Sequence, residues 1–199
     1  MKKKRTAAPQ KTGAGPGALR LIGGQYRGRK LPIAEVEGLR PTGDRLREVL
    51  FNWLQFELPG ALVLDLFAGS GALGLEALSR GAERVWLIEK HPRAAAQLRA
   101  SAADLDCPAL VVEGDVLAWL ARTEVMPVDG VFLDPPFAAD LWAETLQALL
   151  QQGWLKPGAW LYVEAPVRHV LALPAELKVV KEKRAGEVMM RLLRYQAAN

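Results

Sequence analysis

The chain has 199 residues, of which 50% are hydrophobic, and a formal net charge of +4 at pH 7. This length and composition predict one globular domain with a small extension, and they exclude a fibrous or largely disordered protein. No apolar run is long enough to span a bilayer, and no apolar segment follows the basic N-terminus, so we expect neither a membrane span nor a signal peptide. The single cysteine, Cys107, cannot form an internal disulfide, and we therefore expect a cytoplasmic protein.

Positive charge is concentrated near the N-terminus. Residues 1–30 contain lysines and arginines but no acid, and further arginines follow before residue 48. Basic residues grouped in this way indicate a polyanionic partner such as a nucleic acid. Residues 1–17, which are rich in Lys, Thr, Gly, Pro and Ala, are predicted to form a disordered basic tail.

Residues 18–58 are predicted to form an extension that consists of a hairpin and a helix. Two short strands, residues 18–23 and 25–32, should meet at a turn formed by Gly23 and Gly24. An aromatic residue and several basic residues lie on or beside the second strand, and together they suit base stacking and phosphate binding. These residues are Tyr26, Arg27, Arg29 and Lys30.

A helix is expected after a turn at residues 39–42, with Asp44 or Thr42 as its N-terminal cap. Its apolar residues recur at helical spacing and should face the core. They are Leu46, Val49, Leu50, Trp53 and Leu54. The same spacing places Arg45 and Arg47 on the opposite side of the helix.

Residues 59–199 are predicted to form a domain in which strands alternate with helices. Strands are expected at residues 61–66, 84–89, 109–113, 128–134 and 160–164, and helices at residues 70–80, 92–105, 116–121 and 141–151. Such alternation predicts an α/β fold with a mostly parallel sheet covered on both faces. Segments 177–184 and 187–195 should form a closing hairpin that adds an antiparallel strand at or near one edge.

The stretch from Val63 to Gly74, V-L-D-L-F-A-G-S-G-A-L-G, predicts a buried strand that turns sharply into a helix. Gly69 and Gly71 permit positive φ and leave room for a ligand close to the backbone. A turn of this kind, at the carboxyl end of a parallel strand, is where open α/β sheets bind cofactors.

The spacing of Gly69, Gly71 and Gly74 also matches the dinucleotide-binding fingerprint, with Glu89 placed to bind a ribose. Asp65 argues against that ligand. Its carboxylate would repel a pyrophosphate at about 4 Å by on the order of 1 kcal/mol in water and several at an effective dielectric near 20. The ammonium and sulfonium of S-adenosylmethionine would instead be attracted, which makes that cofactor the better match.

Acids fall at comparable places along the alternation. Asp65, Glu89, Asp115 and Asp134 each end a predicted strand or begin the loop after it. They should therefore line one edge of the sheet, where a ligand with several hydroxyl, amine or cationic groups would meet them. For Asp115 a cap on the following helix is an equally good interpretation.

The sequence Asp134-Pro135-Pro136-Phe137 is the sharpest motif in the chain. Two prolines fix the backbone and remove two N–H donors, which leaves carbonyl groups free to accept. Rigid acceptors beside an aromatic ring suit the exocyclic amino group of a flat base that has been extruded from its stack. The alternative is a proline-rich turn followed by a core phenylalanine.

These motifs resemble those of S-adenosylmethionine-dependent amino-methyltransferases. More narrowly, residues 21–32 (L-I-G-G-Q-Y-R-G-R-K-L-P), 39–48 (L-R-P-T-G-D-R-L-R-E) and 51–54 (F-N-W-L) are similar to RsmD-type 16S rRNA (guanine-N2)-methyltransferases of bacteria. The resemblance covers about residues 19–195. Its N-terminal motifs are the specific part, because adenine methylases share the Asp-Pro-Pro-Phe motif.

The resemblance implies a Rossmann-like class I methyltransferase with a seven-stranded sheet, and methyl transfer to N2 of one guanine in the small subunit or its assembly intermediate. It also implies a helix after Glu164, where only residues 167–173 are available. The catalytic set would be Asp134, Pro135, Pro136 and Phe137. The cofactor set would be Asp65, Phe67, Ala68, Gly69, Ser70, Gly71, Glu89, Lys90, Asp115 and Val116. The RNA-contacting set would be Arg20, Tyr26, Arg27, Arg29, Lys30, Arg40, Thr42, Arg45 and Arg47.

Three rival functions remain open at this point. They are an adenine-N6 methyltransferase acting on DNA or RNA, an NAD-linked oxidoreductase, and a non-catalytic RNA-binding protein with a vestigial site. Asp65 disfavours the second, and the N-terminal extension favours ribosomal RNA over DNA. His91 and His169 have no partner cluster in the sequence, so we propose no metal site, and we expect a monomer.

Overall fold

The protein is described by a computed structural model that covers residues 17–36 and 43–197. Residues 1–16 of the predicted tail (residues 1–17), Arg40 and Thr42 lie outside the described residues.

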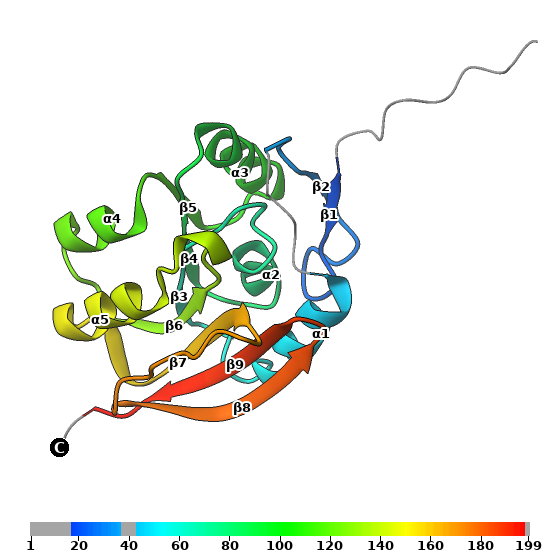
Figure 1. Cartoon of the computed structure of the whole chain (residues 1–199). Coiled ribbons are helices and arrows are strands. Elements are labelled where there is room, and N and C mark those ends of the chain that lie inside the picture. Colours follow the sequence, from blue (N-terminus) through cyan, green and yellow to red (C-terminus); the bar gives the residue numbers. More distant parts are fainter. Residues whose placement is uncertain (1–16, 37–42, 198–199) are drawn as a thin grey trace, which may run out of the picture.

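A seven-stranded sheet forms the centre of the molecule (Figure 1). Its spatial order is β5-β4-β3-β6-β7-β9-β8, and the pairs from β5 to β7 are parallel. Strand β9 is antiparallel to both β7 and β8, so the predicted closing hairpin is confirmed. The strands are β3 (Leu62–Asp65), β4 (Arg84–Glu89), β5 (Ala109–Glu113), β6 (Val128–Leu133), β7 (Leu155–Pro166), β8 (Leu177–Ala185) and β9 (Val188–Tyr195).

Helices cover both faces of this sheet, as the alternating pattern predicted (Figure 1). They are α2 (Gly74–Ser79), α3 (Pro92–Leu105), α4 (Val116–Arg122) and α5 (Trp142–Gln152). Two apolar clusters result, one on each face. Phe132, Tyr162 and Trp160 belong to the cluster beneath α2 and α3, whereas Trp142 and Trp154 belong to the one beneath α4 and α5. The predicted α/β fold, with a mostly parallel seven-stranded sheet covered on both faces, is thereby confirmed.

The N-terminal extension consists of β1 (Ala18–Arg20), β2 (Lys30–Pro32) and α1 (Asp44–Trp53). Its buried residues, including Leu19, Leu31 and Phe51, are part of the same core as the central strands. The extension is therefore packed onto the sheet domain and shares its hydrophobic stabilisation.

The predicted hairpin exists, but its turn differs from the prediction. The strands pair only over residues 18–20 and 30–32, so the glycine pair does not form a tight turn between them. The connecting loop instead hydrogen-bonds to α2: the amides of Ile22 and Gly23 donate to the Glu76 carboxylate, at 2.8 Å each, and the amide of Gln25 donates to the Ser79 carbonyl. Satisfying these donors on α2 removes them from strand pairing.

Several element boundaries also differ from those predicted. Helix α2 begins at Gly74, four residues late, because residues 69–73 form the turn that follows β3. Helix α1 is preceded by Gly43, which makes no side-chain cap, and Asp44 lies in its first turn, so the predicted Asp44 cap is wrong. Strand β7 begins five residues early, with a register irregularity near its start. Residues 167–173 form no helix.

No helix in the described ranges is both long and apolar enough to cross a membrane.

Candidate active site

The predicted acids lie along one edge of the sheet. Strand β3 ends at Asp65 and β4 ends at Glu89. Asp115 lies two residues after the end of β5, and Asp134 directly follows β6. Because these parallel strands are neighbours in the order β5-β4-β3-β6, the carboxyl groups follow one another across a common rim. Asp65 pairs in register with Phe132, two residues before Asp134, so these two acids lie on adjacent strands.

Asp65 is a buried carboxyl and not a solvated one. Its side chain is only 2% exposed, and Oδ2 accepts a hydrogen bond of 2.9 Å from the Gly74 amide. Its pKa is raised to about 7, chiefly by burial and in addition by the neighbouring Glu89 charge, while the amides of Gly74 and Phe67 oppose the shift. Asp65 thus holds the start of α2 in place from the tip of β3.

The turn between β3 and α2 has the backbone geometry that its glycines predict. Gly69 and Gly71 have φ of +53° and +79°, which side chains with a Cβ rarely adopt. The Gly69 amide donates to Glu89 Oε2 at 2.8 Å, and the Ala68 amide donates to the Ile88 carbonyl at 2.9 Å. A Cβ at Gly74 would collide with the side chain of Leu87. Strand β4 therefore braces the turn against the rim.

Side chains of the turn, of the end of β4 and of the start of α4 could contact a ligand bound at this turn. Glu89 is half-buried, and its second oxygen accepts from the His91 amide at 2.6 Å. Each carboxylate oxygen still has a second lone pair to offer a ligand. Phe67 and Ser70 are half-buried, Lys90 is exposed, and Val116 is buried.

Asp115 forms the helix cap that was considered as its alternative role. Its Oδ1 accepts from the amides of Leu117 and Ala118 at 3.1 and 3.2 Å. The Ala118 amide and the nearby Lys90 ammonium, 3.3 Å from Oδ2, keep the pKa of Asp115 below its ordinary value. Capping occupies one oxygen and leaves Oδ2 beside Lys90.

The carboxyl of Asp134 has no hydrogen-bond partner among the described residues. The side chain is half-buried, and no hydrogen bond reaches its oxygens from the described residues. Burial raises its pKa well above the ordinary value, and the charges of Glu164 and Asp65 raise it further. Pro135 is buried and Pro136 is exposed. Phe137, which is 43% exposed, begins a short 3₁₀ helix (Phe137–Ala139). The centroid of its ring lies 5.9 Å from that of Trp142. The motif therefore presents unpaired acceptors beside an accessible aromatic face, and Phe137 is not a core residue.

The sequence interpretation missed Glu164, which continues the same row of acids on β7. Leu133 pairs with Val163, so Asp134 and Glu164 occupy the next matching positions on neighbouring strands. Glu164 is 7% exposed, and its Oε2 accepts a 2.8 Å hydrogen bond from the Tyr162 hydroxyl. Its place at the end of a predicted strand was the signal that could have identified it.

The rim carries carboxyl groups that the described part of the chain does not pair with cations. Asp65, Glu89, Asp134 and Glu164 make no ion pair with any described residue. Buried carboxyl groups are costly without a counter-charge. Such a set suits a ligand that carries positive charge, and the positive-φ glycines suit one that approaches the backbone. The residues present therefore fit S-adenosylmethionine.

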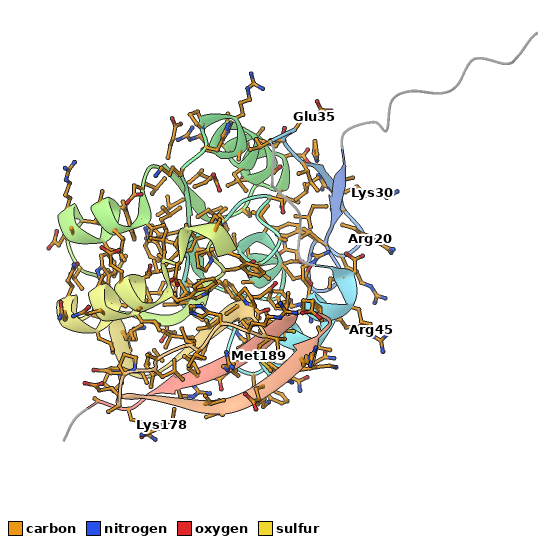
Figure 2. The ribbon with its side chains drawn as sticks, viewed as in Figure 1. Arg20, Lys30, Glu35, Arg45, Lys178 and Met189 are labelled. Carbon is orange, nitrogen blue, oxygen red and sulfur yellow. The ribbon has the colours of Figure 1, made fainter. Side chains whose placement is uncertain are left out.

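Most of the predicted RNA-contacting side chains are exposed on the extension. Arg20, Arg27, Lys30 and Arg45 are exposed and form no ion pair with described residues. Figure 2 shows three of them pointing outward along one side of the molecule. Arg20 and Lys30 are paired across the β1–β2 ladder. Arg29 forms an ion pair of 2.6 Å with Asp104 on α3, and Tyr26 is half-buried.

Arg47 does not lie on the exposed side of α1, so this part of the prediction is wrong. Its side chain is 0% exposed, and Nη2 donates to the Arg20 carbonyl at 2.9 Å and to Asp44 at 2.7 Å. Nη1 lies 3.6 Å from a carboxylate oxygen of Glu76, which is itself fully buried and also accepts from Arg80 at 2.7 Å. Arg47 and Glu76 therefore join the extension to α2, a role that the helical spacing could not distinguish from an exposed one.

Comparison with known proteins gives the family. The model described as conserved hypothetical protein 95, which represents the RsmD family, matches residues 19–194. The chain belongs to this family. Ribosomal RNA small subunit methyltransferase D of Escherichia coli K12 is 47% identical over 186 residues, which cover 92% of this chain and 93% of that protein. The protein of the same name from Haemophilus influenzae is 44% identical over 180 residues, covering 88% and 93%.

Solved structures agree with this assignment. A putative methyltransferase from Escherichia coli superposes with a TM-score of 0.84 at 46% identity, covering 92% of this chain and 100% of that one. This member of the RsmD family is accordingly an S-adenosylmethionine-dependent methyltransferase. The adenine-methylating, NAD-linked and non-catalytic alternatives are not favoured.

Proposed function

We propose that this RsmD-family enzyme methylates the exocyclic N2 of one guanine in 16S rRNA, within the small ribosomal subunit or an assembly intermediate. The names of its relatives support small-subunit rRNA as the substrate. One observation carries the chemistry: Asp134 presents an unpaired carboxyl, next to the cofactor edge and beside the exposed ring of Phe137.

The cofactor would lie along the carboxyl ends of β3, β4 and β5. Asp65 and the turn at residues 68–71 would hold the methionine part, where the buried carboxyl gains a cationic partner. Glu89 would accept from the ribose hydroxyls, and Asp115 Oδ2 from the adenine amino group. Phe67, Lys90 and Val116 would flank the nucleoside.

The target amino group would bind at the next strand. Its two N–H bonds would donate to the Asp134 carboxylate and the Pro135 carbonyl, while Phe137 stacks on the ring. Guanine N2 is a weak nucleophile because its lone pair is conjugated with the ring. Holding both N–H bonds directs that lone pair at the methyl carbon. Positioning is then the main catalytic contribution.

The transfer is an in-line displacement. A bond forms between N2 and the methyl carbon while the bond from that carbon to sulfur breaks, and its electron pair stays on sulfur. The Asp134 carboxylate stabilises the positive charge that develops on N2. The methylated ammonium then loses one proton to solvent, so Asp134 need not remove it before transfer.

The extension would bind the rRNA around the target. Arg20, Arg27, Lys30 and Arg45 are exposed, and they lie on elements that are fixed to α2 through Glu76 and Arg47. Phosphate contacts of this kind position an enzyme on its RNA, whereas the base pocket supplies the specificity. We expect the enzyme to act as a monomer.

Small subunits from a strain that lacks this activity provide the test. Wild-type enzyme should transfer a labelled methyl group from S-adenosylmethionine to these subunits and to no adenine in duplex DNA. The Asp134→Ala variant should bind S-adenosylhomocysteine normally in calorimetry but transfer little. Labelling of N6-methyladenine in DNA or RNA would support the adenine-methylating rival instead.

A further inference from the structure

Glu164 lies where a second donor on the same edge of the target base would meet the protein. In the β6–β7 ladder, Phe132 pairs with Tyr162 and Leu133 with Val163, so Glu164 stands beside Asp134. Side chains two residues apart on a strand share a face. Phe132 and Tyr162 both belong to the cluster beneath α2 and α3, with ring centroids 6.3 Å apart. Asp134 and Glu164 therefore project from this same face.

The surroundings of Glu164 do not account for a carboxyl at this position. Among the described residues its side chain has one hydrogen-bond partner, the Tyr162 hydroxyl, and no cationic partner. Burial raises the pKa values of both Glu164 and Asp134; the Glu164 charge raises that of Asp134 further, whereas the Tyr162 hydroxyl opposes the shift of Glu164. A buried carboxyl beside another carboxyl destabilises the protein unless something else uses it. Met190, which lies opposite Glu164 on β9, is buried and apolar.

Guanine offers two adjacent donors on the edge that carries N2. Its N1–H and its N2 amino group point in the same direction, whereas adenine has an unprotonated acceptor at N1. Neighbouring strands lie about 4.8 Å apart, and glutamate is one methylene longer than aspartate. Two carboxyl groups on adjacent strands can therefore reach two adjacent donors of one base.

We propose that Glu164 is a specificity-determining residue that accepts the N1–H of the target guanine while Asp134 holds the N2 amino group. This inference rests on the proposed function and adds a reason for the choice of base. The Tyr162 hydroxyl donates to Oε2 of Glu164, and no described residue donates to Oε1, which is the oxygen offered to the base. In its ionised form Glu164 can only accept, so it accepts the N1–H of guanine, whereas adenine N1 would face an acceptor with its own lone pair.

The test replaces the target guanine by 2-aminopurine, which keeps the 2-amino group but has an acceptor at N1. Subunits are reconstituted from 16S rRNA ligated around either base at the mapped position. The measured quantity is kcat/KM on guanine divided by kcat/KM on 2-aminopurine, for wild type and for Glu164→Gln. Comparing the two enzymes cancels the different intrinsic reactivity of the two amines.

Glutamine can accept from guanine N1–H through its oxygen and donate to 2-aminopurine N1 through its nitrogen. The guanine preference of Glu164→Gln should therefore fall about tenfold or more below that of wild type. Tyr162→Phe, which keeps the carboxyl and removes only its partner, is the matched control and should retain most of the preference. Glu164→Asp, which withdraws the carboxyl by one methylene, should also lower it and decides the case if Glu164→Gln does not fold.

A different result overturns the inference. If Glu164→Gln slows both substrates by the same factor, the preference is unchanged and Glu164 only supports the structure. If wild-type enzyme transfers no methyl group to guanine-containing subunits, the proposed function itself fails. The two failures are distinguishable because the first requires an active wild-type enzyme.

Discussion

Replacing Asp65 by asparagine is expected to stabilise the cofactor-free enzyme above neutral pH while weakening cofactor binding. The folded-state pKa of about 7 lies above the ordinary value of 3.8 because the carboxyl is buried. The protonated form is thus the one that favours the fold. Its contribution is fully present below about pH 3.8 and is lost as the pH rises through about 7.

The magnitude follows from that difference in pKa. The titration of Asp65 should cost about 2 kcal/mol of folding free energy at pH 5, where folding takes up a proton, and about 4 kcal/mol at pH 8, where the buried carboxyl is ionised, relative to a side chain that is always neutral. Asparagine carries no charge at either pH, and its carbonyl oxygen can accept the Gly74 amide in place of Oδ2. Loss of the interaction with the Phe67 amide offsets about 1 kcal/mol of the gain, equally at both pH values.

Urea unfolding of both proteins at pH 5 and pH 8 measures this effect. The advantage of Asp65→Asn should grow by roughly 2 to 3 kcal/mol between the two pH values, which corresponds to a midpoint change of about 1 M. Glu124→Gln, which neutralises an exposed carboxylate on the loop after α4, should show the same pH dependence as wild type.

Cofactor binding should change in the opposite direction. A cationic ligand next to Asp65 favours its ionised form, so binding of S-adenosylmethionine near pH 7 should release protons, and Asp65→Asn should bind it at least tenfold more weakly. Calorimetry in buffers of different ionisation enthalpy detects the protons. An Asp65→Asn variant with no greater stability at pH 8 than at pH 5, relative to wild type, would refute the reasoning.

Other changes test the remaining parts of the site. Asp134→Ala should lower kcat by about a hundredfold or more without changing the affinity for S-adenosylhomocysteine, as measured by single-turnover transfer and calorimetry. Phe137→Ala should lower kcat/KM about tenfold or more through lost stacking, with the melting temperature nearly unchanged because the ring is 43% exposed. Glu76→Ala should lower the free energy of unfolding by about 3 kcal/mol or more, since it leaves two amides and buried Arg47 without this acceptor. Arg27→Glu should weaken binding to small subunits and reduce its salt dependence, with methyl transfer restored at saturating subunit concentration.

The sequence was most informative where local pattern and topology agree. Alternating apolar runs and helical spacing located β4 (Arg84–Glu89) and α3 (Pro92–Leu105) to the residue, because the Pro92 start of α3 and its polar flanks are local signals. The shared edge of Asp65 and Asp134 followed from the rule that parallel strands point the same way.

Local sequence pattern could not predict contacts between segments that are distant in the chain. Arg47 was assigned to the exposed side of its helix by spacing, but its burial depends on Glu76 and on the Arg20 carbonyl, far away in the chain. The loop after β1 was read as a tight turn, although its amides are satisfied by α2. Glu164 ends a predicted strand, as the other rim acids do, but only the pairing of β6 with β7 sets it beside Asp134.

The most direct measurement maps methylated nucleotides in 16S rRNA from cells with and without this enzyme, by mass spectrometry of nuclease fragments. We predict that one N2-methylguanine disappears when the gene is deleted, returns with the wild-type gene, and does not return with Asp134→Ala. Small-subunit rRNA whose methylation pattern is identical in the presence and absence of the enzyme would contradict the account.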